Sequence, residues 1–176
     1  MQKEKNSVIS FAMQAGLGLG AFWVFKYIFI IASTQYSALG YVNTFLSFIT
    51  PLFLLFYLIK FKNEAIDKKL SYWKGVRVGV MVFLFASIIE SVIVIVHILW
   101  IDPAFISIIN QQKIDLAQSL GFSDMIMEEL KKQTSFSPFK FVFDQILNNV
   151  FIGFILSLVL TPVASKVDLS IKRFDK

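Results

Sequence analysis

The sequence predicts an all-α integral membrane protein, a four-helix bundle with an amphipathic helical segment outside the bilayer. Hydrophobic residues make up 56% of the 176 residues and charged residues only 16%, whereas about a quarter of a soluble domain is charged. About 20 mostly apolar residues are needed to cross roughly 30 Å of hydrocarbon. Stretches of this kind occur at residues 8–32, 41–59, 75–100 and 139–163. We therefore expect one membrane domain, residues 1–176, with the lipid bilayer as its surroundings.

The first stretch could be mistaken for a secretory signal because Lys3 and Lys5 precede it. The apolar core of a signal is usually about 7–15 residues long. This stretch is longer and contains Lys26. We therefore expect it to be a retained helix.

The basic residues lie mostly at the ends of the stretches. Twelve of the 17 Lys and Arg residues fall in the two terminal segments and in the loop 60–77. Because cytoplasmic loops carry an excess of Lys and Arg, we predict that both termini and this loop are cytoplasmic. The net charge of +5 is not gathered on a soluble domain, so no nucleic-acid partner is expected.

Proline residues mark two features of the spans. Thr50 and Pro51 lie inside the second stretch, where a proline removes a backbone hydrogen bond and kinks the helix. Ser137 and Pro138 precede the fourth stretch and have the order of a helix cap followed by a first-turn proline. The pair therefore predicts the start of the fourth helix.

The segment 103–137 is the largest predicted part outside the bilayer. Asp102 and Pro103 predict a cap and the first residue of a new helix, Gly121 interrupts the apolar spacing, and Ser123 predicts the start of a second short helix. Such a segment can lie in the membrane interface, roof the bundle or cover a partner. Its mildly acidic charge argues against attraction to an anionic lipid surface.

Ionisable residues inside the apolar stretches form the candidate site. Lys26, Glu90 and Asp144 each lie in a predicted span, where a charge costs a few kcal/mol. A rise of about 1.5 Å per residue puts them in one layer of the outer half of the bilayer. His97 shares a helical face with Glu90, and Asn148 shares one with Asp144. This intramembrane polar layer is either a ligand site or a structural ion pair that fixes helix register.

Metal, cofactor and catalytic chemistry are not indicated. Only Glu90 shares a face with His97, which is too few ligands for a metal site. The chain contains no cysteine, so thiolate ligands and cysteine nucleophiles are excluded. It also lacks the serine elbow, the HExxH pair and the phosphate loop of common enzyme classes. We therefore predict no cofactor, and an enzyme is the less favoured class.

Small residues predict close helix packing. Ala12, Gly16 and Gly20 form a ridge at four-residue spacing, and Gly75 and Gly79 form a second one. Such ridges let helices approach closely, within a bundle or between two copies. We favour contact between the two ridges inside one bundle over homodimerisation.

The order of these features resembles a known family. It combines four spans, an extramembrane helix and three short motifs. The motifs are Leu70-Ser71-Tyr72-Trp73-Lys74-Gly75-Val76-Arg77-Val78-Gly79, Ile101-Asp102-Pro103-Ala104-Phe105 and Gly153-Phe154-Ile155-Leu156-Ser157-Leu158. Together they resemble the bacterial membrane proteins called domain of unknown function 4199. That resemblance implies a multi-pass protein of the cytoplasmic (inner) membrane of Gram-negative bacteria, with no assigned activity and no catalytic residue to carry over.

Three functional hypotheses follow. The first is a non-catalytic subunit that binds a membrane protein partner, a second copy of the chain or a lipid. The alternative is a small transporter or proton-coupled carrier that uses Lys26, Glu90 and Asp144. A second alternative is an intramembrane enzyme that acts on a lipid-linked substrate.

Overall fold

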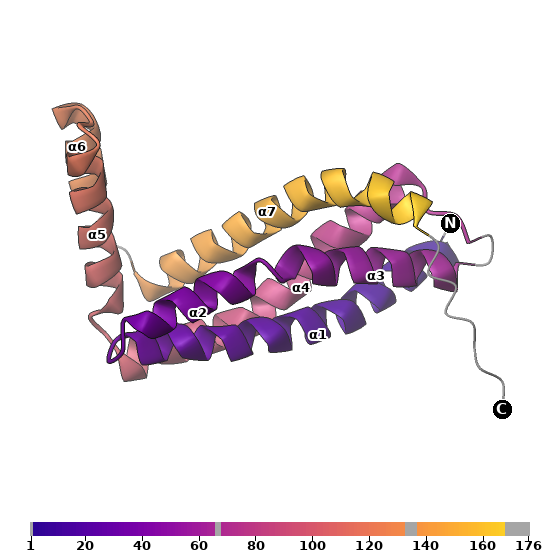
Figure 1. Ribbon diagram of the computed structural model, residues 1–176, viewed down its shortest axis with the longest axis horizontal. Coiled ribbons are helices and arrows are strands. Elements are labelled where there is room, and N and C mark those ends of the chain that lie inside the picture. The colour runs from indigo at the N-terminus through magenta and orange to yellow at the C-terminus, as the bar shows by residue number, and fades with distance from the viewer. Residues whose placement is uncertain (1, 66–67, 133–136, 168–176) are drawn as a thin grey trace.

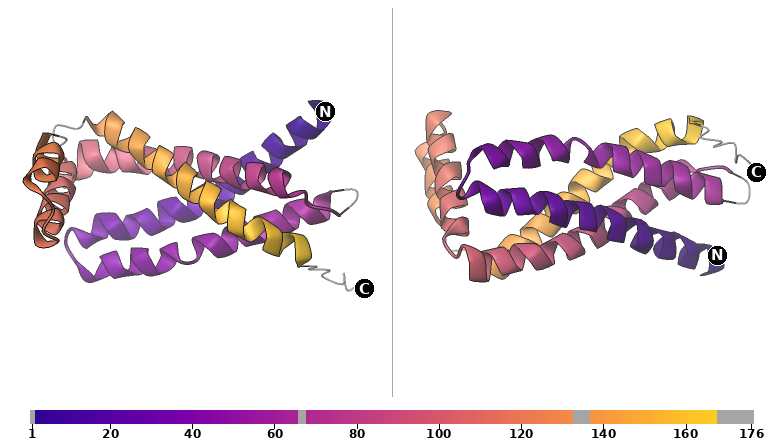
Figure 2. Two further views of the ribbon diagram at one scale, coloured as in Figure 1. Left: turned by 90° about the horizontal axis from the view of Figure 1, so that it is seen from above. Right: turned by 60° about the horizontal axis from the view of Figure 1, so that its bottom comes forward.

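Four membrane-length helical segments run lengthwise through the molecule, and two shorter helices lie across one end (Figures 1 and 2). This computed structural model describes residues 2–65, 68–132 and 137–167. Within those ranges every regular element is a helix. The elements are α1 (Gln2–Ser33), α2 (Ala38–Ser47), α3 (Thr50–Glu64), α4 (Tyr72–Val96), the π-helical turn η1 (His97–Ile101), α5 (Phe105–Ser119), α6 (Asp124–Lys132) and α7 (Pro138–Lys166).

Four helical segments are long and apolar enough to cross a membrane. They are Val8–Ser33, Ala38–Glu64, Tyr72–Ile101 and Pro138–Lys166. Each contains one of the apolar stretches predicted from the sequence. The predicted fold class, a helical membrane bundle of four spans, is confirmed.

The second span consists of two helices, where the sequence predicted a single helix with a kink at Pro51. The break falls at Phe48 and Ile49, between α2 and α3. Pro51 lies in the first turn of α3, where its missing N–H is not needed. The indole of Trp23 on α1 donates a 3.2 Å hydrogen bond to the Thr50 hydroxyl, which fixes the break against α1.

Helix α4 is the central element, because it packs against both α1 and α7. Helix α3 packs mainly on α7, and α2 packs on α1. The main core cluster is built mostly from α1, α3 and α4, and its largest fully buried members are Leu19, Leu54, Leu58 and Phe83. Half of the most apolar window of the third span is buried, against 17% for the fourth. Most of α7 therefore faces outward.

Helix α4 ends in a π-helical turn, and the segment that follows differs from the prediction. The Asp102 amide donates to the His97 carbonyl at 2.8 Å, which closes the wide turn η1. We expected a helix from Pro103, but α5 begins at Phe105. The Asp102 carboxylate instead accepts a 3.1 Å hydrogen bond from the Ala104 amide, so residues 102–104 form a short turn before α5.

Helices α5 and α6 form a hairpin at the end of the bundle where α4 ends and α7 begins (Figure 1). Gly121, with a positive φ of 69°, lies in the turn that joins them. Ile106 at the base of α5 belongs to a second core cluster with Tyr27, Val94, Ile98 and Val142. The predicted start of the fourth span is confirmed, since the Ser137 hydroxyl accepts a 3.2 Å hydrogen bond from the Lys140 amide.

Candidate functional site

Glu90 lies at the centre of a buried polar cluster. Its side chain is on α4, and the residue is only 4% exposed. One carboxylate oxygen, Oε2, accepts hydrogen bonds from the Gln145 amide at 3.2 Å and from the Asn149 amide at 3.0 Å. Both donors come from α7. Because a charge inside a bilayer is stable only with polar partners, these two amides stabilise Glu90 and tie α4 to α7.

The inward face of α7 is a stripe of residues spaced four apart. It begins at Gln145 and Asn149 and continues through Gly153, Ser157 and Thr161, and the last three are buried. Residues four apart share a helical face, so the small residues that let α7 approach α4 also direct the two amides at Glu90. This stripe is visible in the sequence, and the prediction did not use it.

Lys26 approaches the same cluster from α1. Its ammonium donates a 3.2 Å hydrogen bond to the Ser47 hydroxyl on α2 and lies 5.5 Å from the centre of the Trp23 ring. Its charge is opposite to that of Glu90, and we expect an attraction between the two groups. Among the described residues, however, the two groups form no direct ion pair. Lys26 and Glu90 are therefore not in direct contact, and their pairing stays a prediction.

Together, Lys26, Ser47, Glu90, Gln145 and Asn149 are called the Glu90 cluster below. It draws one residue each from α1, α2 and α4 and two from α7. Lys26 donates to one neutral side chain of a neighbouring helix, and Glu90 accepts from two. Such an arrangement fixes the rotation of the helices about their axes, and it keeps a carboxylate inside the bundle.

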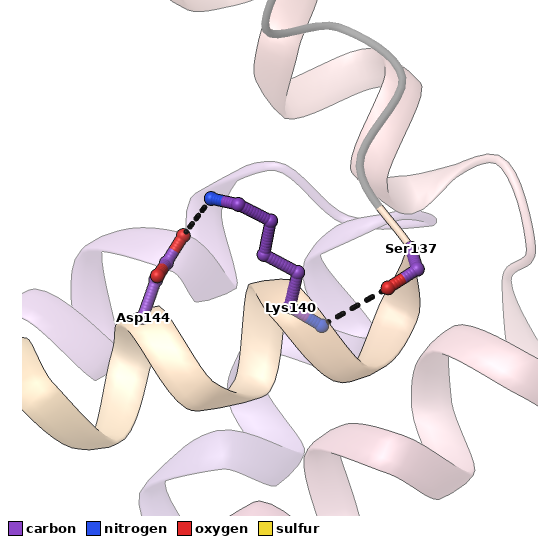
Figure 3. A network of polar contacts seen from close by, with 3 residues as sticks. All are labelled: Ser137, Lys140 and Asp144. Carbon is purple, nitrogen blue, oxygen red and sulfur yellow. Dashed lines mark hydrogen bonds and ion pairs between the residues drawn. The ribbon is translucent and has the colours of Figure 1, made fainter.

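Asp144 and Asn148 do not join this cluster, which corrects the predicted polar layer. Both residues are exposed. The Asp144 carboxylate forms a 3.0 Å ion pair with Lys140, one turn earlier on α7, and both side chains are about half exposed. Figure 3 shows the Lys140 side chain reaching along the helix to Asp144. Because Gln145 and Asn149 face inward, Asp144 and Asn148 are turned about 100° away from them.

His97 lies in a separate buried contact, two turns beyond Glu90 on the third span. Its ring Nδ1 is 3.0 Å from the Tyr27 hydroxyl, and the Phe105 ring packs against it with centroids 4.5 Å apart. The side chain is fully buried, and Nε2 has no hydrogen-bond partner. His97 therefore joins α1 to the base of α5, and it makes no hydrogen bond to Glu90.

One known protein family matches this chain. A model described as a protein of unknown function, DUF4199, matches residues 14–165, which is most of the chain. The chain belongs to the DUF4199 family. The comparisons with curated proteins and with solved structures gave no match. The whole Glu90 cluster lies inside the region of this DUF4199 protein that the family model matches.

The small residues of the DUF4199 chain pack within the bundle, but the two predicted ridges do not face each other. A side chain at Gly16 would place its Cβ 2.5 Å from the Cβ of Phe85 on α4, and one at Gly20 would come within 2.8 Å of Ile89. Ala12 is fully buried in the same helix face. The α1 ridge therefore lies on the middle of α4.

The second ridge, on α4, faces the last span of the DUF4199 chain. A Cβ at Gly75 would collide with Thr161, and one at Gly79 would collide with Ser157. The prediction of contact between the ridges is thus replaced by two separate close contacts, α1 with α4 and α4 with α7. Each glycine meets a polar or bulky side chain of the neighbouring helix because α4 lies between the other two.

Proposed function

We propose that this chain is a non-catalytic subunit of a membrane complex and that it binds another membrane protein through the outward face of α7. The proposal rests on Asp144 and Asn148, which follow Lys140 at four-residue spacing; we call the three residues the α7 polar stripe. They are exposed, although they lie in a helix apolar enough to cross the membrane. A polar face of this kind calls for a partner.

The depth of the stripe supports this proposal. The fourth span covers Pro138–Lys166, so its midpoint is at residue 152. At about 1.5 Å per residue, Asn148 lies about 6 Å and Asp144 about 12 Å from the midpoint. Both values are below the half-thickness of the hydrocarbon, which is about 15 Å. Lipid tails offer no hydrogen bonds to an amide or a carboxylate at that depth.

The chemistry of the stripe defines its partner. Lys140 and Asp144 neutralise each other, so the stripe has no net charge and presents hydrogen-bonding groups. A transmembrane helix with Ser, Thr, Asn or Gln on one face complements such a surface, because interhelical hydrogen bonds join helices in membranes. We therefore expect a polar-faced transmembrane helix of another membrane protein as the partner, and a second copy of this chain as the other outcome.

Affinity purification in mild detergent tests the proposal. The double variant Asp144→Leu, Asn148→Leu makes the stripe apolar, and the matched control Phe143→Leu, Leu147→Met changes exposed residues at the same depth on another face. We expect the control to keep the partner and the stripe variant to lose it while retaining its helical circular dichroism. Two differently tagged copies reveal self-association. Recovery of the wild-type chain alone, after several detergents and crosslinking, would contradict the proposal.

A proton-coupled carrier is the second candidate, because Glu90 is a buried carboxylate inside the third span and a lysine, Lys26, lies in the first. A carboxylate in a membrane span is a group that can take up and release a proton during transport. Four spans are few for a monomeric pathway, so the carrier would act as an oligomer. Proton flux into liposomes, read with an enclosed pH-sensitive dye, should fall in Glu90→Gln. A proton flux that equals the wild-type flux in both Glu90→Gln and Asp144→Asn would rule this candidate out.

The proposed location is the bacterial cytoplasmic membrane, with both termini in the cytoplasm. The positive-inside rule supports this orientation, since the basic loop 60–77 and the two termini share one side of the four-span topology. The α5–α6 hairpin then lies on the outer side of that membrane.

A further inference from the structure

The α5–α6 hairpin lies across one end of the bundle. The views show the spans running lengthwise and the hairpin crossing their end, and in Figure 1 the tip of the hairpin rises past the start of α7 (Figures 1 and 2). The axis of the four spans is close to the membrane normal, because these helices are the segments that cross the bilayer. The hairpin therefore lies parallel to the membrane plane.

Short connections keep the base of the hairpin at the membrane surface. Residues 102–104 join η1 to α5, and five residues separate α6 from α7. A fully extended chain reaches about 3.5 Å per residue, so the two links reach about 10 Å and about 17 Å. About 10–15 Å of a bilayer is polar in total, which is about 5–8 Å on each side of the hydrocarbon, so the shorter link keeps the start of α5 close to this region. Packing of Ile106 in the second core cluster holds the base at the same level.

The free tip of the hairpin is apolar. Around Gly121 the exposed fractions are 60% for Leu116, 65% for Leu120 and 77% for Met125, and Phe122 and Ile126 are also exposed. The opposite face of α5 buries Ile114 and Ala117. The hairpin therefore uses one side of α5 for its own packing and leaves large apolar side chains uncovered at the part that extends beyond the bundle.

We propose that this tip inserts into the headgroup and acyl boundary of the adjacent lipid leaflet, as an interfacial anchor built from two helices. An amphipathic helix that lies in the interface plane buries its apolar side chains about 5–10 Å deep. The hairpin has the required orientation, and its tip lies outside the bundle's own cross-section. Between residues 105 and 132 it carries four acidic and three basic residues. The expected surface is therefore a zwitterionic one, because an acidic segment is repelled by anionic lipid.

The absence of cysteine from the chain makes a depth measurement direct. Single variants Leu116→Cys and Met125→Cys are labelled with a nitroxide in the full-length protein, reconstituted into phosphatidylcholine vesicles. The matched control is Gln118→Cys, an exposed polar position about 160° around α5 from Leu116. Accessibility to dissolved oxygen is compared with accessibility to a water-soluble nickel chelate, since oxygen concentrates in lipid and the chelate does not.

The proposal predicts at least a fivefold higher ratio of oxygen to chelate accessibility at residues 116 and 125 than at residue 118. Replacing part of the phosphatidylcholine with an anionic lipid should reduce that ratio. Equal ratios at all three positions would place the tip in water and overturn the proposal. Labels at residues 116 and 125 that are immobilised and shielded from both reagents would place a protein on the tip and overturn it as well.

Discussion

The electrostatic interaction between Lys26 and Glu90 can be measured by a double-mutant cycle with Lys26→Met and Glu90→Gln. Two unit charges 4 Å apart at an effective dielectric constant of 20 interact by about 4 kcal/mol. The two groups form no direct ion pair among the described residues, so about 4 kcal/mol is an upper limit. A separation of about 6–8 Å gives about 2–3 kcal/mol by the same relation. We therefore predict a coupling energy of about 2 kcal/mol.

The assay is unfolding in mixed micelles with increasing dodecyl sulfate, followed by the loss of helical circular dichroism. Each single substitution should lower the free energy of unfolding, because it leaves a charge inside a membrane span without its counter-charge. The double variant should lose less than the sum of the two. The cycle cancels the loss of the Lys26 hydrogen bond to Ser47, since that loss occurs with and without Glu90. A coupling energy below about 0.5 kcal/mol would refute the inferred interaction.

Three further predictions concern packing, the Glu90 cluster and topology. Gly16→Ala should lower the free energy of unfolding by about 1–3 kcal/mol, because its Cβ would collide with α4. The control Gly40→Ala, whose Cβ would have its nearest neighbour at 3.7 Å, should not lower it, and equal effects of the two variants would contradict the close contact. Asn149→Leu should lower the free energy of unfolding by about 0.5–2 kcal/mol, because the buried Glu90 carboxylate loses a hydrogen-bond donor. Asn148→Leu should leave the free energy of unfolding unchanged or raise it, and a larger loss with Asn148→Leu than with Asn149→Leu would contradict the assigned face of α7. Lys68→Cys should react with an impermeant maleimide in inverted membrane vesicles and not in intact cells, and labelling in intact cells would reverse the proposed orientation.

The spans could be predicted from the sequence because their signal is long and local. Each apolar stretch identifies a helix by composition alone, and Ser137 with Pro138 marks a helix start through one cap hydrogen bond. The break between α2 and α3 was harder to place. Pro51 signals that the helix is interrupted, but the interruption lies before the proline, where the first turn of a new helix accepts it.

The polar partners of Glu90 were missed because α7 carries polar residues on two neighbouring faces. Asp144 and Asn148 form one pair, and Gln145 and Asn149 form another, only one residue further along. Charge favoured the pair with Asp144. Packing turns Gln145 and Asn149 toward Glu90 instead, because they share a helical face with Gly153, which packs closely on α4. The hairpin also could not be placed from sequence, since its angle to the bundle depends on the packing of Ile106.

The α7 polar stripe is the central claim, and photo-crosslinking within the membrane tests it most directly. A photoreactive amino acid is placed at Asn148 or, as the control, at Leu147, which is exposed at nearly the same depth on another face. Living cells are irradiated before any detergent is added. The account predicts a discrete crosslinked membrane protein from position 148 and mainly lipid adducts from position 147. Lipid adducts alone from both positions would contradict it.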